Sequence, residues 1–192
     1  LSIAQYLFDP PAGSNIAPWQ IAHYHGGDVA GYTDKSGFAA TLFKGDGENV
    51  LAIRGVEAGL PGTEGSDVYH DLLGASVGGV GMMGAAVTQI IDMVNLIGRL
   101  TAAAGATVKQ YHASLSLTRP AADTAYVELT GELVFGLDVP MYLSFGSHDQ
   151  PGVGIGALSA GDKITLTGHS LGGHLAVVAA KLFPGLVNAD VY

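Results

Sequence analysis

Cysteine is absent from the 192-residue chain, which excludes disulfide bonds and thiolate metal sites. Basic residues are scarce: Lys and Arg total 8 against 17 Asp and Glu, and they form no run. Nucleic-acid binding through phosphate neutralisation is therefore not expected. Charged residues make up only 13% of the chain while 48% is hydrophobic, so we expect a packed core rather than intrinsic disorder.

Glycine is abundant, at 29 residues, and follows no triplet period. This excludes collagen and indicates many tight turns and close backbone approaches. The length suits one domain, 1–192, which we expect to be of the α/β class. Two strand-like runs, 37–43 and 49–55, flank the turn-forming residues 44–48 and predict a β-hairpin.

Further elements are predicted toward the C-terminus. Strand patterns occur at 106–111, 163–167 and 187–192, a helical pattern at 171–183, and a turn signal at 149–152. Residues 113–160 are rich in β-forming side chains, and we interpret them as a β-rich insertion over the core.

The longest uncharged segment covers residues 72–91 and is formally long enough to span a bilayer. Its glycines and its scattered Ser, Thr and Gln make it only weakly hydrophobic, and the helical pattern continues through Asp92, Asn95 and Arg99. We therefore expect a largely buried helix of about 25 residues here rather than a membrane span.

Two segments match the pattern G-x-S-x-G, residues 168–172 and residues 74–78. A nucleophilic serine of this pattern sits on a sharp turn between a buried strand and a helix, which exposes its hydroxyl. Ser170 meets that requirement, because the β-rich run 164–167 precedes it and a helix of small residues follows. Ser76 opens the glycine-rich helical segment instead, so we interpret it as a helix-packing residue.

The residues around Ser170 suit attack on a carbonyl carbon. Gly168 and Gly172, two positions before and after the serine, leave room for the strained turn. The amide of Leu171 is expected to point at the developing oxyanion, where the helix N-terminus adds partial positive charge. His169 fills the variable position of the motif and is expected to pack rather than to transfer protons.

The run 167–176, TGHSLGGHLA, resembles the nucleophile elbow of the class 3 lipases, a family of α/β-hydrolases. Residues 52–56, AIRGV, resemble the Arg-Gly motif that ends the family's oxyanion strand, and the acidic, cysteine-free, glycine-rich composition is similar to that of bacterial secreted lipases. The resemblance implies an α/β-hydrolase fold, acyl-ester hydrolysis by Ser170, no required cofactor and a secreted location. It also implies an oxyanion hole made by the amides of Leu171 and Val56.

One position departs from the family pattern. The family usually has Ser or Thr after Arg-Gly, whereas this chain has Val56, so the amide can donate but the hydroxyl is missing. Loss of one oxyanion donor typically lowers the rate about a hundredfold or more. The family's mobile lid corresponds to residues 57–87, whose apolar face could make transient contact with a lipid surface; the alternative is a core helix preceded by a surface loop.

A nucleophilic serine also needs a general base and an acid that orients it, in the chain order Ser, acid, His. After Ser170 the sequence offers only His174, one helical turn along the same helix, and Asp190, too early for the family's acid. We therefore expect the N-terminal portion of an α/β-hydrolase fold, ending after the nucleophile helix. The acid and the histidine are expected on a missing C-terminal segment or a companion chain.

No metal site is expected from the remaining ligand-type residues. His23 and His25, with Asp28 nearby, could share a metal ion on one strand face, but they lack a third well-spaced ligand and are interpreted as surface polar residues. Calcium could bind between Asp67 and Asp71, although no loop signature supports it. The other histidines are interpreted as isolated: His70, His112 and His148.

Three interpretations of function follow from the sequence. The leading one is a lipase or carboxylesterase that cleaves acyl esters through an acyl-serine intermediate. Val56 and the missing triad partners motivate the second, a non-catalytic α/β-hydrolase-fold binding module. The third is another serine hydrolase with the same elbow, such as a peptidase, a thioesterase or a polyester depolymerase.

Overall fold

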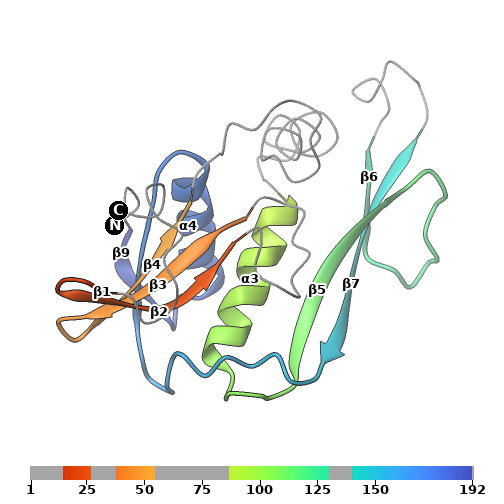
Figure 1. Cartoon of the computed structure of the whole chain (residues 1–192). Coiled ribbons are helices and arrows are strands. Elements are labelled where there is room, and N and C mark those ends of the chain that lie inside the picture. Colours follow the sequence, from red (N-terminus) through yellow and green to blue (C-terminus); the bar gives the residue numbers. More distant parts are fainter. Residues whose placement is uncertain (1–14, 27–37, 55–86, 130–139, 192) are drawn as a thin grey trace.

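The computed structural model describes residues 15–26, 38–54, 87–129 and 140–191 (Figure 1). Within these ranges the chain forms a six-stranded sheet, a three-stranded sheet and the helices α3 (Val87–Thr101) and α4 (Leu171–Leu182). The first part of the expected long helix, 72–86, lies outside the described residues. Neither α3 nor α4, the helices of the described ranges, is long and apolar enough to cross a membrane.

The larger sheet has the strand order β1-β2-β3-β4-β8-β9. Its strands are β1 (Asn15–Ile16), β2 (Trp19–His25), β3 (Ala40–Gly45), β4 (Glu48–Ile53), β8 (Ile164–Gly168) and β9 (Val187–Val191). Neighbours from β1 to β4 are antiparallel, whereas β4, β8 and β9 are parallel. The strands predicted at 163–167 and 187–192 and the helix between them are therefore confirmed as a β8–α4–β9 unit.

The predicted hairpin is also confirmed, because β3 and β4 pair along their whole length. Asp46 and Gly47 connect the two strands, with φ of 50° and 79°. Two successive positive φ angles are typical of the type I′ turn, whose twist matches that of the flanking strands. Asp and Gly are residues that adopt this backbone region at low steric cost.

Both helices cover one face of the larger sheet, since both contribute to a single core cluster with its strands. The sheet and the segment leading into it supply Phe38, Leu42, Leu51, Ile53, Ile164 and Leu166; α3 supplies Met93, Leu96, Ile97 and Leu100; α4 supplies Leu175, Ala176 and Ala179. Because side chains alternate along a strand, the other face carries a second buried cluster made by Ile21, Phe43, Val50 and Ala52.

The smaller sheet consists of β5 (Val108–Ser116), β6 (Tyr126–Leu129) and β7 (Met141–Gln150) in the antiparallel order β5-β7-β6. It occupies much of 113–160, where further strands were expected, and it extends away from the larger sheet (Figure 1). The prediction of a turn at 149–152 is wrong for Asp149 and Gln150, which belong to β7. Gln150 pairs with Val108 at the end of the ribbon, so the chain turns only at Pro151 and Gly152.

Asn95 of α3 attaches the smaller sheet to the helix. Its buried side-chain amide donates to the Tyr111 carbonyl at 2.9 Å and accepts from the Tyr111 N–H at 2.8 Å. Among the described strands Tyr111 lies on an edge, β5, and the one Asn95 side chain satisfies both backbone groups of Tyr111 that β7 does not pair.

Candidate active site

Ser170 lies between the end of β8 and the start of α4, and it is exposed. Its backbone angles are φ 56° and ψ −123°, a combination that residues with a Cβ rarely adopt. The side chain makes no capping hydrogen bond to the helix. The chain therefore bends sharply at Ser170 and holds its hydroxyl at the carboxyl end of the sheet, where it is open to solvent.

The two glycines of the motif are required by close backbone contacts. A Cβ on Gly168 would lie 2.3 Å from the Gly172 carbonyl carbon, and a Cβ on Gly172 would lie 2.3 Å from the carbonyl oxygen of Ile53. Real Cβ atoms essentially never approach so closely, and the contacting atoms belong to the backbone and cannot rotate away. The spacing G-x-S-x-G is thus the spacing at which the first turn of α4 packs against both β8 and β4.

The ends of β4 and β8 lie side by side, because the two strands pair in parallel with Ile53 opposite Gly168. Arg54 follows directly, half-buried, and its N–H donates to the Ala39 carbonyl at 2.9 Å. Arg54 thus lies at the same end of the sheet as Ser170, where β4 and β8 both finish. Val56, the second expected oxyanion residue, lies outside the described residues.

The backbone amides at the start of α4 differ in their hydrogen bonding. The N–H of Gly172 donates to the His169 carbonyl at 3.0 Å, and the N–H of His174 donates to the Ser170 carbonyl at 3.1 Å. Over the described part of the chain, the N–H of Leu171 has no acceptor. A free amide directly after the serine, at a helix N-terminus, is the donor that a negatively charged oxygen near Ser170 would meet.

The two nearest candidate triad residues lie on α4 and β9, the elements that follow the serine. His174 is half-buried on α4, and its buried Nε2 has no hydrogen-bond partner within the described ranges. Asp190 lies near the end of β9, the strand that pairs in parallel with β8. Among the residues described, none donates a hydrogen bond to, or accepts one from, the Ser170 hydroxyl. His169 is exposed, so the expectation that it packs is wrong.

Several expectations fall on residues outside the described ranges. They concern the second motif match with Ser76, residues 57–86 of the expected lid segment 57–87, and the calcium alternative at Asp67 and Asp71. Asp28, the third member of the His23 and His25 group, lies outside as well.

The interpretation of His23 and His25 as surface polar residues is wrong. His25 is 4% exposed, and Arg99 of α3 donates from Nη2 to its Nδ1 at 3.1 Å. Burial, with the neighbouring charges of His25 and Arg99, lowers the pKa of His23 from 6.5 to about 4. A guanidinium beside the two rings opposes a bound cation, so this pair is poorly suited to hold a metal ion.

The interpretation of His112 and His148 as isolated is also wrong, because their ring centroids are 5.9 Å apart. Sequence spacing gave no signal for this pair, which forms only through the pairing of β5 with β7. Across the described ranges, no group of three or more His, Cys, Asp or Glu residues could hold a metal ion.

Comparison with known proteins adds no family to these observations. No protein-family model matches the chain, no curated protein matches it, and no solved structure matches it.

Proposed function

We propose that this protein is a serine hydrolase that cleaves acyl esters, with Ser170 as the nucleophile. The observation that carries the proposal is the position of Ser170 between β8 and α4, where its backbone is strained and the residue is exposed. Strain of this kind is typical of nucleophile positions, where it aims a hydroxyl away from the sheet. The resemblance of residues 167–176 to the class 3 lipase elbow supports the α/β-hydrolase assignment, and with it an exported enzyme that meets lipid surfaces transiently.

In the proposed reaction, the Ser170 oxygen attacks the ester carbonyl carbon and its proton passes to a general base. The carbonyl oxygen becomes an oxyanion, which the Leu171 amide and the positive end of α4 stabilise. Collapse of this intermediate breaks the bond to the alcohol, which leaves with the proton, and water then hydrolyses the acyl-serine. The general base and the acid that orients it are the parts of this site that no described residue supplies.

Hydrolysis of p-nitrophenyl esters of increasing acyl length tests the proposal. The full natural chain should release p-nitrophenol, and Ser170→Ala should reduce the rate by at least about a thousandfold, because the covalent step is lost. A preference for long acyl chains indicates a lipase, and a preference for acetate or butyrate indicates an esterase. Equal rates for the wild type and Ser170→Ala would contradict the proposal.

The missing hydroxyl at Val56 favours one alternative, a binding module that keeps the fold without catalysis. A folded wild-type chain that hydrolyses no ester, and whose Ser170 is unreactive, would support it. Thioesters and polyesters extend the same assay to the other serine hydrolases that use this elbow.

A further inference from the structure

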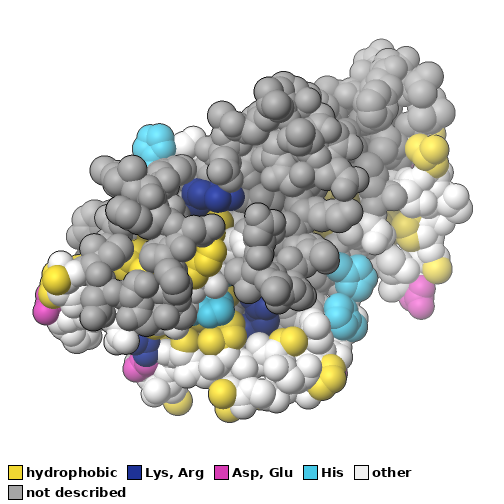
Figure 2. All heavy atoms as spheres, viewed as in Figure 1, with side chains coloured by type: hydrophobic (Ala, Val, Ile, Leu, Met, Phe, Trp, Pro, Cys, Tyr) yellow, Lys and Arg dark blue, Asp and Glu magenta, His cyan; other side chains and the backbone are white. Residues whose placement is uncertain are grey.

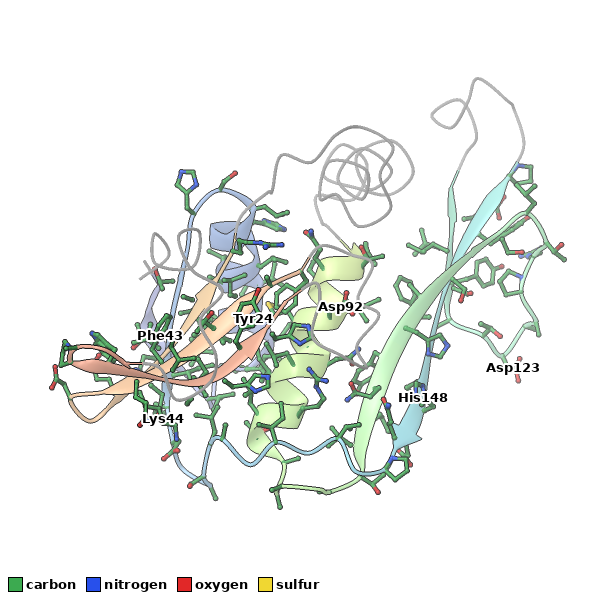
Figure 3. The ribbon with its side chains drawn as sticks, in the orientation of Figure 1. Tyr24, Phe43, Lys44, Asp92, Asp123 and His148 are labelled. Atoms are coloured by element: carbon green, nitrogen blue, oxygen red, sulfur yellow. The ribbon has the colours of Figure 1, made fainter. Side chains whose placement is uncertain are left out.

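His112 and His148 lie on one face of the β5–β7 ribbon. The register pairs His112 with Gly146 and Gln110 with His148, so the two histidines occupy diagonal positions on adjacent strands and project from the same side. Both are exposed, and histidine side chains lie together on the molecular surface over these strands (Figure 2). Figure 3 labels His148 near the end of β7.

Gly146 gives the His112 ring its position. A Cβ on Gly146 would lie 2.6 Å from Nε2 and 2.8 Å from Cε1 of His112, so the ring lies directly over this glycine. Any larger residue would displace the ring from the face of the sheet. The ring therefore lies across the strand that carries His148, with a ring nitrogen over β7.

The separation of the two rings suits chelation of one ion. With metal–nitrogen bonds of about 2 Å and each nitrogen about 1 Å from its ring centroid, two imidazoles on a tetrahedral ion have centroids about 5 Å apart. The observed 5.9 Å differs from that value by an amount that small rotations of two exposed side chains can close.

We propose that His112 and His148 bind one divalent transition-metal ion of the zinc, nickel or copper type, with water in the remaining coordination positions. Imidazole nitrogen is a ligand that these ions favour, whereas calcium and magnesium prefer oxygen. No described Lys or Arg contacts either ring, in contrast to the Arg99 guanidinium beside His25. The site is independent of the proposed chemistry at Ser170.

Titration of the full, untagged chain with ZnCl₂ by calorimetry tests the proposal, with CaCl₂ as the comparison ion. The wild type should bind one Zn²⁺ at this site and no Ca²⁺ there. His112→Gln and His148→Gln should each lower the Zn²⁺ affinity at least about tenfold, because the second imidazole then no longer binds intramolecularly. Paramagnetic Ni²⁺ should broaden the imidazole resonances of these two residues first.

Three further single variants separate the effect of ring geometry from the effect of losing a histidine. Gly146→Ala keeps both ligands but pushes the His112 ring aside, so it should also weaken Zn²⁺ binding. Ser147→Ala, on the opposite face of the same strand, and His169→Gln, an exposed histidine elsewhere, should bind like the wild type. The proposal is overturned if the wild type binds no Zn²⁺, or if the double variant His112→Gln/His148→Gln binds it as tightly as the wild type.

Discussion

Gly172 and Ile53 are in such close backbone contact that no side chain fits between them: a Cβ on Gly172 would lie 2.3 Å from the Ile53 carbonyl oxygen. The two residues belong to α4 and β4, elements separated by most of the chain's length. The contact places the first turn of the helix, and with it the bend at Ser170, directly against the end of the strand that leads into Arg54.

Gly172→Ala should therefore destabilise the fold by at least about 2 kcal/mol, because the added methyl group meets backbone atoms that can move only if α4 moves. Chemical denaturation followed by circular dichroism measures the change. Gly185→Ala is the matched control, since a Cβ there meets nothing within 4 Å. Equal stabilities of the two variants would show that α4 does not pack against β4 this closely.

The backbone strain at Ser170 predicts an unusual order of stabilities. Ser170→Gly should be more stable than Ser170→Ala by about 1 kcal/mol, because glycine alone adopts φ 56° and ψ −123° without a steric penalty. At an ordinary position the order is reversed, since glycine loses more chain entropy on folding. Thermal denaturation of both variants decides the sign, and a more stable Ala variant would mean that Ser170 is unstrained.

Asn95 should be a strong determinant of how the smaller sheet is held. Asn95→Ala leaves the N–H and the carbonyl of Tyr111 without their partner and should lower stability by about 2–3 kcal/mol. Hydrogen exchange should show lost protection at the Tyr111 amide. Asn188→Ala, which removes an exposed hydrogen bond to Thr165, should change stability by less than about 1 kcal/mol. Similar losses in both variants would contradict this role for Asn95.

The lowered pKa of His23 predicts that the folded protein becomes less stable as the pH falls. The unfolded chain binds a proton at His23 near pH 6.5, whereas the folded chain does so only near pH 4. The contribution of neutral His23 to the free energy of unfolding is therefore complete above pH 6.5, and it is lost as the pH falls from 6.5 to 4. Because the ring is only partly buried, we expect this loss to be about 1–2 kcal/mol.

His23→Gln removes the titrating group and should flatten the stability profile between pH 6.5 and 4. His169→Gln, at an exposed position, should leave that profile unchanged. Urea denaturation at a series of pH values measures both. A His23→Gln profile as steep as that of the wild type would assign the acid sensitivity to other groups.

The parts of the fold that were predicted from sequence are those fixed by neighbouring residues. The β3–β4 hairpin follows from two apolar runs around Asp46-Gly47, and the β8–α4 junction follows from a β-rich run, the glycines around Ser170 and a helical pattern. In each case the signals belong to two elements that follow one another directly in the chain.

The features that were not predicted from the sequence depend on contacts between residues that are far apart in the chain. The pairing of β2 with β3 shifts register between Ile21 and His23, which breaks the alternation that marks a strand. The burial of His25 depends on Arg99, 74 residues away. The approach of His112 to His148 depends on the register of β5 against β7, which no local pattern specifies.

Labelling of the folded, full natural chain with a fluorophosphonate probe, mapped by mass spectrometry, tests the role of Ser170 most directly. The proposal predicts a covalent adduct on Ser170, no adduct in Ser170→Ala, and normal labelling in Ser76→Ala, the second match to the motif. An adduct on Ser76, or an unlabelled Ser170 under conditions that label another serine hydrolase in the same tube, would contradict it.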